Sequence, residues 1–321
     1  MIKKIAIILV LLLIVINISA CRGDDNEEPY EEIPVSVGVD DAALRNTILY
    51  FEDDNGYLVP TMRQIQWEEG IGRASVENLK SDDQKNISLS EKGLLPILSM
   101  DTQVKLSISD GLAICDLSQG AILADDLLSE KNKVDAVINT LCEFDSIDAV
   151  QITIDGENIE SLPNGTLIGM PVVPEEINVE TAADASIVGE NKIRLYFENQ
   201  TTSVLVPVTR GIFAEPNEFS VMTELMRGPT KNSGLSNIFP EGTRLLDIKV
   251  TDQNVLEVNL SKEAKGLKDS PEKEKMLMMI LLKTFEQFDN VDNVRILIDG
   301  KEYLDSAKET MALMLYINII E

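Results

Sequence analysis

The sequence Leu-Tyr-Phe-Glu occurs twice in this chain, at residues 49–52 and again at residues 195–198. The tripeptide Leu-Val-Pro follows each time, at 58–60 and at 205–207, so the two pairs of matches are separated by 146 and 147 positions. One repeated tetrapeptide is weak evidence, but several matches in the same order at a nearly constant spacing indicate a tandem duplication. The motif that opens the repeated unit is therefore present twice in the chain.

Further matches extend the repeat over most of the chain. Arg63 corresponds to Arg210, and Ile-Asp-Gly at 154–156 corresponds to the same tripeptide at 298–300. A period of this length is too long for a solenoid repeat and fits a domain of ordinary size. We therefore predict two similar domains, which we call copy one and copy two.

The N-terminus has the layout of a lipoprotein signal peptide. Lys3 and Lys4 precede an unbroken apolar run at 5–16, and the sequence Ile-Ser-Ala leads directly into Cys21. A charged start, a short apolar core and small residues before the cut are typical of secretory signals, and the run is shorter than the roughly 20 residues of a membrane span. Residues 18–21 resemble the bacterial lipobox, which implies a diacylglycerol anchor on the cysteine, outside the cytoplasmic membrane. An unlipidated signal peptide and an uncleaved anchor are the alternatives.

These observations divide the chain into five parts. We predict a lipoprotein signal peptide at 1–20 and an acidic, disordered tether at 21–44, because like charges and prolines extend a chain. Copy one covers residues 45–173 and copy two covers residues 191–321. A polar, acidic linker at 174–190 joins them.

Each copy is expected to be an α/β domain of the α+β-like kind, with the approximate order ββ-α-ββ-α-ββ and helices packed on a mixed sheet. Residues 192–197 and 203–209 are predicted to form a hairpin in copy two. In copy one the corresponding turn contains Asn55 and Gly56, a strong hairpin signal. The second strand of each hairpin contains a proline, which favours an edge position.

The helices begin and end at recognisable signals. Pro216 suits the first turn of the first helix in copy two, and Arg-Gly-Pro at 227–229 ends that helix. The second helix is predicted to start with Ser270 as its N-cap and Pro271 at its first position. The other predicted strands lie at 104–109 and 112–117 in copy one and at 245–250, 255–260, 294–298 and 311–320 in copy two.

The composition excludes several classes of function. The 321 residues contain 28 lysines and arginines against 55 aspartates and glutamates, a net charge of −27, and no histidine. So negative a chain repels phosphate backbones, and we predict no nucleic-acid partner. The lack of histidine excludes Ser-His-Asp and Cys-His nucleophiles and His-ligated metals, and three cysteines are too few for a Cys-rich zinc site. We predict no catalytic residues, no metal site and no cofactor.

Carboxylates that recur in both copies are the residues from which a glycoside hydrolase would be built. Glu52 and Glu198 lie where a strand meets a turn, and we expect them to be solvated charges at an edge. Asp155 and Asp299 precede a glycine at a strand end, where aspartate ordinarily makes a turn. The expected roles of both pairs are structural.

Arg63 and Arg210 are cations that both copies of an acidic protein contain. A structural ion pair is the first interpretation, and a contact with an anion or a partner is the second. Cys115 and Cys142 occur in copy one only. Free buried thiols are expected there, and a disulfide between them is the alternative outside the cytoplasm.

The repeated pattern resembles the GerM-type (Germane) domain of bacterial sporulation and germination proteins. The resemblance rests on the opening Leu-Tyr-Phe strand, the Leu-Val-Pro return with its arginine, and the closing Ile-Asp-Gly. Copy two adds Leu-Met-Arg-Gly-Pro at 225–229, Phe-Pro-Glu-Gly-Thr at 239–243 and Asn-Leu-Ser at 259–261. Copy one lacks the Gly-Pro and Gly-Thr of these motifs, which weakens a site built from those loops without affecting the fold.

The resemblance implies a non-catalytic scaffold or binding protein, anchored through Cys21 on the extracytoplasmic face of the cell membrane and acting in sporulation or germination. The implied partners are other envelope or sporulation proteins, peptidoglycan and further copies of this chain, because the domain is compared with ring-building modules. A solute-binding lipoprotein of a transporter and a wall hydrolase are the alternatives. No cleft motif supports the first of these, and the absence of histidine weakens the second.

Overall fold

The computed structural model describes residues 44–66, 70–180, 189–306 and 318–320, all within one compact unit, Ala42–Glu321. Cys21 and the signal peptide, the tether up to residue 43, and most of the strand expected at 311–320 lie outside the described residues. No helix of the described part is long and apolar enough to cross a membrane.

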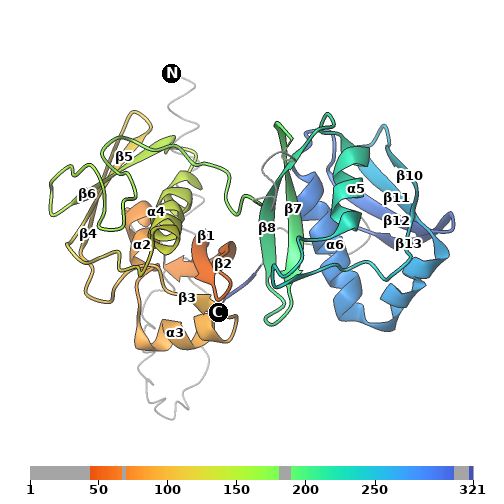
Figure 1. The fold of residues 1–321 in the computed structure, drawn as a ribbon, viewed down its shortest axis with the longest axis horizontal. Helices are drawn as coiled ribbons and strands as arrows, with labels where there is room; N and C mark the ends of the chain where they lie inside the picture. The colour runs from red at the N-terminus through yellow and green to blue at the C-terminus, as the bar shows by residue number, and fades with distance from the viewer. Residues whose placement is uncertain (1–43, 67–69, 181–188, 307–317, 321) are drawn as a thin grey trace, which may run out of the picture. The chain divides into compact units, whose positions relative to one another are not determined.

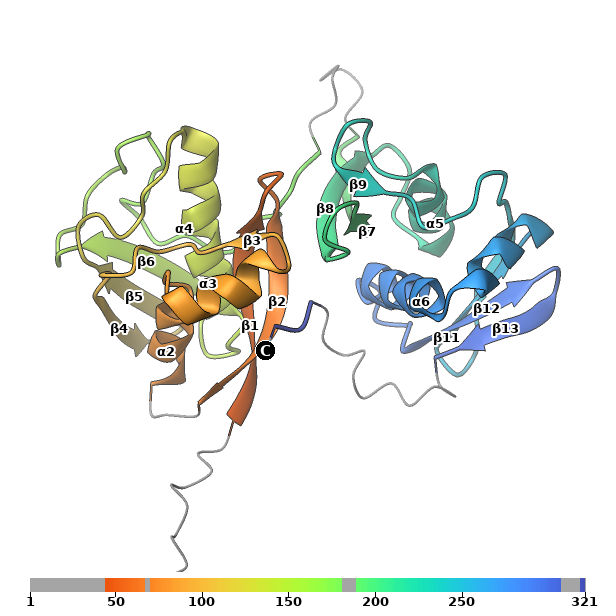
Figure 2. The same ribbon diagram turned by 90° about the horizontal axis from the view of Figure 1, so that it is seen from below.

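Copy one consists of two small sheets with a helix between them (Figures 1 and 2). The first sheet has the strand order β2-β1-β3 and the second has the order β4-β5-β6. Helix α4 (Leu127–Cys142) packs against β1 on one side and β6 on the other. The remaining elements are β1 (Leu44–Asp53), β2 (Leu58–Gln66), α2 (Ile71–Glu77), α3 (Asp83–Ser90), β3 (Leu94–Leu95), β4 (Val104–Ser109), β5 (Leu112–Leu117) and β6 (Ala149–Ile154).

Copy two has the same architecture. Its first sheet has the order β8-β7-β9, and its second has the order β10-β11-β12-β13, in which β11 and β12 are parallel and the other neighbours antiparallel. Helix α6 (Pro271–Phe285) packs against β7 and β12. The remaining elements are β7 (Asn191–Asn199), β8 (Leu205–Ile212), α5 (Glu218–Arg227), β9 (Leu235–Ser236), β10 (Leu245–Val250), β11 (Val255–Leu260), the 3₁₀ helix η3 (Lys262–Asp269), β12 (Asn293–Ile298) and β13 (Lys301–Asp305).

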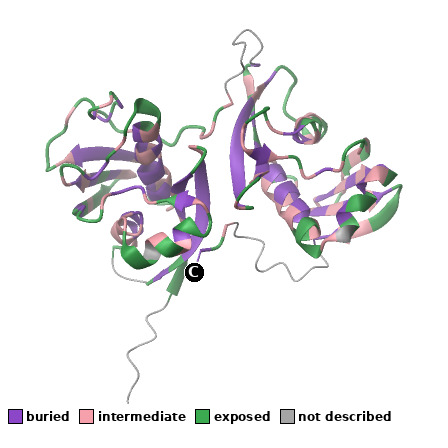
Figure 3. Cartoon of the chain, turned by 60° about the horizontal axis from the view of Figure 1, so that its bottom comes forward, coloured by how far each residue is buried: buried purple, intermediate pink, exposed green. Residues whose placement is uncertain are grey.

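The predicted fold class is confirmed, with the strands of each copy divided between two sheets. The reason lies in the central helices, which bury residues on more than one side: Met278 and Ile280, which point to well-separated sides of α6, are 2% and 1% exposed. A helix that is apolar over most of its circumference must be covered on both sides. Figure 3 shows this distribution, with buried residues on the central helices and inner strands and exposed residues at the rims.

Most of the predicted boundaries agree with the structure. The four strands expected at 104–109, 112–117, 245–250 and 255–260 are β4, β5, β10 and β11. Ser270 caps α6, accepting the N–H of Lys273 at 3.4 Å, and Pro271 is the first helical residue. Pro216 was placed wrongly: α5 begins after the N-cap Asn217, so the proline precedes the cap.

Three kinds of element are absent from the sequence-based prediction. The strands β3 and β9 have only two residues each, and α3 has no clear apolar face in sequence. Strand β13 follows the turn at Asp299 and pairs antiparallel with β12. The turn therefore starts a hairpin in copy two.

Pro60 and Pro207 lie in β2 and β8, each an edge strand of its three-stranded sheet, as predicted. Because proline has no N–H to donate, an edge is where a sheet tolerates it. Short segments run along these two edges. Val179 forms a parallel bridge with Thr209 of β8, and Ile320 forms one with Arg63 of β2.

Two asparagines hold these edge segments in place. Asn178 accepts the N–H of Leu58 at 2.8 Å and donates to the carbonyls of Leu58 and Pro207, both at 2.7 Å. Asn318 makes the reciprocal set, accepting the N–H of Leu205 at 2.7 Å and donating to the carbonyl of that residue and to one in β2. Both asparagines have positive φ, 53° and 54°, a conformation that asparagine adopts more readily than most residues. Each side chain therefore bonds to one strand of each copy.

Candidate functional site: the paired arginines

Arg63 and Arg210 occupy equivalent positions on β2 and β8, and both side chains point into the protein. Arg63 is 9% exposed and Arg210 is 8% exposed. The edge strands place them beside the segments that begin at Asn318 and Asn178, respectively. A guanidinium buried this deeply is stable only when acceptors or opposite charges surround it.

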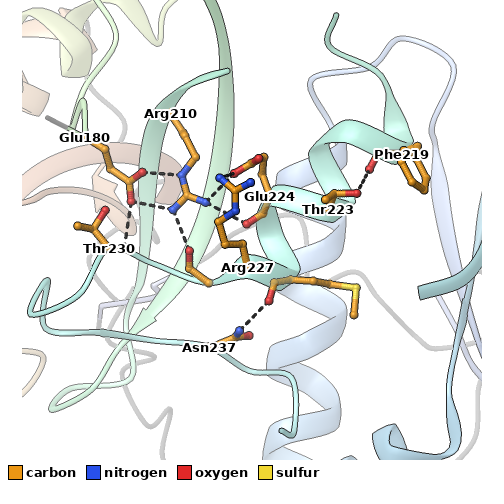
Figure 4. A network of polar contacts seen from close by, with 10 residues as sticks. Glu180, Arg210, Phe219, Thr223, Glu224, Arg227, Thr230 and Asn237 are labelled. Carbon is orange, nitrogen blue, oxygen red and sulfur yellow. Dashed lines mark hydrogen bonds and ion pairs between the residues drawn. The ribbon is translucent and has the colours of Figure 1, made fainter. Parts of the chain in front are cut away.

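Arg210 has a complete set of acceptors (Figure 4). Its Nε donates to Oε2 of Glu180 at 2.5 Å and its Nη2 donates to Oε1 of the same carboxylate at 2.9 Å. This bidentate geometry is the strongest pairing between an arginine and a carboxylate. Glu180 comes from the linker, held at the edge of β8 by its own N–H, which donates to the carbonyl of Thr209 at 2.9 Å.

The C-terminal end of α5 supplies the other contacts. Nη1 of Arg210 donates to the carbonyl of Glu224 at 3.0 Å and reaches its carboxylate at 3.3 Å, and Nη2 donates to the carbonyl of Gly228 at 2.8 Å. Arg227 pairs with the same Glu224 carboxylate at 3.0 Å. Because Gly228 ends α5 with φ of 84°, its carbonyl is turned out of the helix ladder and is free to accept.

These contacts outweigh the cost of burial. Burial alone would lower the pKa of Arg210, but the hydrogen bonds and charges of Glu180 and Glu224 raise it above the ordinary arginine value. Burial would likewise raise the pKa of Glu180, and Arg210 lowers it instead. In copy two the arginine therefore serves as the centre of an ion-pair network.

Arg63 lacks such a network. Its side chain makes no hydrogen bond or ion pair among the described residues, and its Nη1 is shielded from solvent with no acceptor there. Burial lowers its pKa, and the charge of Asp82 only partly opposes this effect. The two arginines share no bonding partner in the described part of the chain, so they form two separate environments.

The recurrent carboxylates have structural surroundings. Glu52 is only 7% exposed, which corrects the expectation of a solvated charge, and its Oε1 accepts from Asn132 at 3.0 Å. Burial raises its pKa, although the Asn132 hydrogen bond opposes the shift. Asp155 and Asp299 both have φ of 51° and stand in turns, as predicted.

Cys115 lies buried on β5 and Cys142 ends α4, and both are free thiols. Burial raises the pKa of Cys115 to about 12 and that of Cys142 to about 11. Neither is therefore a ready nucleophile at neutral pH. The alternative of a disulfide between them is not what the structure shows, and no cluster of three metal-ligating side chains occurs in the part that it describes.

An apolar pocket of about 580 Å³ lies on copy one, formed by the segment that follows β6. Its rim carries Leu167 and Met170, which are 70% and 76% exposed. It contains neither arginine and is not a cleft between two lobes of the kind that a solute-binding protein closes around its ligand. We derive no binding role from it.

The sequence contains no distinctive signal for these sites. Ile-Asn precedes both edge segments, at 177–178 and at 317–318, but the same dipeptide also occurs at 16–17 and at 138–139. The two occurrences before the edge segments differ in spacing from the other repeats, being 140 positions apart. Glu180 and Glu224 carried no recurring pattern, because copy one has no acidic residue at either place.

Comparison with known proteins agrees with this architecture. The family model described as Germane, sporulation and spore germination, matches residues 48–160 and 194–304. The chain is 29% identical over 273 residues to the spore germination protein GerM of Bacillus subtilis, across 81% of this chain and 73% of that protein. The solved tandem GerMN domains of that protein superpose with a TM-score of 0.61 at 23% identity, over 87% of this chain and all of theirs, which shows the shared fold. The duplicated body with its two inward-facing arginines thus belongs to the Germane family of sporulation and spore germination domains.

Proposed function

We propose that this protein is a non-catalytic, lipid-anchored scaffold of the cell envelope that acts in sporulation or spore germination. The observation that carries the proposal is the placement of two Germane domains behind a lipobox-like sequence ending at Cys21. The similarity to a spore germination protein supports the process. Diacylglycerol supplies two acyl chains, the minimum for stable anchoring.

A binding role agrees with the chemistry of the described residues. Three of the four recurring carboxylates lie in turns (Asp155, Asp299) or in a buried hydrogen bond (Glu52), and Glu198 is half-buried on β7. Burial raises the pKa values of the two described thiols. A scaffold needs surfaces for partner proteins, peptidoglycan or further copies of itself.

The strands β4 and β10 are the surfaces on which we place docking. Each is an edge strand of its sheet, and each exposes one large apolar side chain, Ile108 at 46% and Leu246 at 49%. An unpaired edge offers N–H and C=O groups to a strand of another molecule. Edge-to-edge association of copies, or addition of a partner strand, would use both the backbone groups and these apolar side chains.

The anchor is tested by Cys21→Ser in the full chain expressed in a sporulating bacterium. The wild type should fractionate with membranes and yield an N-terminal peptide carrying diacylglycerol by mass spectrometry, and the variant should yield neither. Cys142→Ser, a thiol inside the folded body, is the matched control and should remain membrane-bound. A wild-type protein with an unmodified Cys21 would refute the anchor.

The docking surface is tested by light scattering coupled to size exclusion on the unit Ala42–Glu321, alone and with peptidoglycan fragments. Ile108→Lys and Leu246→Lys should weaken self-association or partner binding, because lysine protects a sheet edge. Leu128→Lys, on an exposed position of α4 at 64%, is the control for surface charge. A strict monomer that binds no partner and responds to no edge variant would contradict the scaffold role.

A further inference from the structure

Arg63 and Arg210 stand at the same position of the repeated fold, but only Arg210 is neutralised. Both are more than nine-tenths buried. Arg210 contacts two carboxylates and two carbonyls, whereas Nη1 of Arg63 is shielded from solvent without an acceptor among the described residues. Buried polar groups are normally paired, so an unpaired guanidinium nitrogen at this depth calls for an explanation.

The first missing carboxylate is the one at the edge of the sheet. In copy two the N–H of Glu180 donates to the carbonyl of Thr209, the residue before Arg210. In copy one the N–H of Ile320 donates to the carbonyl of Met62, the residue before Arg63. Ile320 therefore takes the place of Glu180, and at 3% exposure it fills that place with an apolar side chain.

The second missing carboxylate is the one on the helix. The buried residues Val76 and Leu79 correspond to Met222 and Leu225, which sets the alignment of α2 with α5. By this alignment Asn78 stands where Glu224 stands in copy two. The amide of Asn78 is bonded within its own helix, to the carbonyl of Ala74 at 2.8 Å.

A pocket lies between the end of α2 and the end of β2, the strand that carries Arg63, although Arg63 itself is not in its lining. This polar pocket of about 410 Å³ has Asn78, Ser81 and Asp82 in its lining. Asn78 and Asp82 are at the positions whose counterparts, Glu224 and Gly228, both contact Arg210. Gln66, which ends β2, and the carboxylate Glu77 also line the pocket.

We propose that Arg63 is a carboxylate-binding site, which receives from a peptide segment of a partner protein the acidic side chain that copy two supplies to Arg210 from within. The ligand class follows from the intact site: a glutamate carboxylate that pairs with the planar guanidinium, as Glu180 does. Its entry is from the pocket of Asn78, because Ile320 occupies the sheet edge. This site is separate from the edge strands β4 and β10, so its test is independent of the test of the docking proposed above.

The test follows the arginine Nε–Hε signals by NMR in the unit Ala42–Glu321, which has its own core. Arg63→Lys and Arg210→Lys assign the two signals. The probe is N-acetyl-glutamate α-N-methylamide, and the neutral control is the glutamine analogue, both at constant ionic strength. We expect the Arg63 signal to shift saturably with the acid, with an affinity at least about tenfold above that for the amide, since charge-assisted hydrogen bonds are the stronger ones. The Arg210 signal should not move.

Three further variants locate the site. Asn78→Glu should abolish the Arg63 titration, because it supplies the carboxylate that Glu224 supplies in copy two, and Asn78→Gln should preserve it. Glu321→Gln should leave the titration unchanged. The residue lies outside the described part of the chain but directly follows Ile320, so it is the source that must be separated from an external ligand.

Three results would overturn the proposal. The first is a wild-type Arg63 signal that shows no saturable shift with the acid. The second is an equal response of Arg63 and Arg210, which would indicate general ionic effects. The third is an Arg63 signal that responds to the acid in Glu321→Gln but not in the wild type, which would mean that Glu321 of the chain itself fills the site.

Discussion

Arg63 and Arg210 occupy equivalent positions in the two copies of the fold, but their neighbours compensate the burial of the two charges to different degrees. Arg210 exchanges its hydration for a bidentate carboxylate and three further acceptor contacts. Arg63 is equally buried and has no such exchange among the described residues. Removing one member of a buried pair leaves an uncompensated charge, whereas removing an unpaired charge leaves none.

Arg210→Met and Arg63→Met should therefore differ in their effect on the free energy of unfolding. We expect Arg210→Met to cost about 3 kcal/mol, because it leaves the carboxylate of Glu180 buried without its cation. Arg63→Met should change stability by less than about 1 kcal/mol, or increase it, since burial of its charge is poorly compensated. Urea unfolding followed by circular dichroism measures both values. Equal costs would show that Arg63 has a partner comparable to Glu180.

The pairing of Glu180 with Arg210 should also make the free energy of unfolding depend on pH. Although burial would raise its pKa, the hydrogen bonds and charge of Arg210 lower it in the folded state. The folded pKa thus lies below the unfolded value of about 4.3, so the stabilisation is present above that value and is lost as the pH falls through the folded pKa. Between neutral pH and about pH 3, Glu180→Gln should lose less stability than the wild type. Urea midpoints across this range check it, with the exposed Glu241→Gln as the control that should follow the wild type.

At the scale of elements, the first helices of the two copies begin in different ways. Asn217 caps α5 with a full capping box, its side chain accepting the N–H of Ser220 at 3.0 Å while the Ser220 hydroxyl accepts the N–H of Asn217 at 2.9 Å. The matching helix α2 follows Gly70, which stands at the N-cap position in a left-handed conformation with φ of 91° and gives no side-chain cap. Copy two therefore holds its first helix, and with it Glu224, more firmly.

Asn217→Ala should lower the free energy of unfolding by about 1 kcal/mol, the usual cost of losing an N-cap side chain. The loss arises because the N–H of Ser220 is left without its side-chain acceptor. Thermal and urea unfolding of the unit Ala42–Glu321 measure it. Asn290→Ala is the matched control, because it removes an exposed hydrogen bond from Asn290 to Glu218 of α5. It should cost less than about 0.5 kcal/mol. An unchanged stability in Asn217→Ala would show that the box contributes nothing to the fold.

At the scale of the whole molecule, the dominant feature is charge. The chain carries a net −27, and self-repulsion of this kind opposes the compact state. The buried ion pair of Arg210 is screened much less by salt than the exposed charges are. Added salt should therefore relieve repulsion more than it weakens the pairs that hold the fold.

We predict that the Tm of the unit Ala42–Glu321 rises by several degrees at neutral pH between about 0.01 M and 1 M sodium chloride, as the Debye length falls from about 30 Å to 3 Å. Differential scanning calorimetry measures the shift. The same salt series near the isoelectric point of the full chain, about pH 4.3, is the control and should show a much smaller change. A Tm that falls with salt at neutral pH would mean that attractive pairs outweigh the net charge.

Local chemistry accounts for the part of this fold that was predictable from sequence. Strand alternation and turn residues placed β4, β5, β10 and β11 at their observed bounds, and Ser270 with Pro271 marked the start of α6. These signals act within a few residues, so they are readable along the chain. The two-residue strands β3 and β9 gave no such signal, because their formation depends on strands that lie far away in the sequence.

Local patterns along the chain were enough to predict a duplicated α/β domain with an arginine at the same place in each copy. The burial of these arginines and their contacts depend on long-range packing. Asn178 and Glu180 reach β8 from the segment that follows copy one, and Ile320 reaches β2 from the segment that follows copy two. These two segments do not share the spacing of the repeated motifs. Whether a buried charge is paired depends on which side chains long-range packing brings within hydrogen-bond distance. No periodicity or motif in the chain encodes that distance.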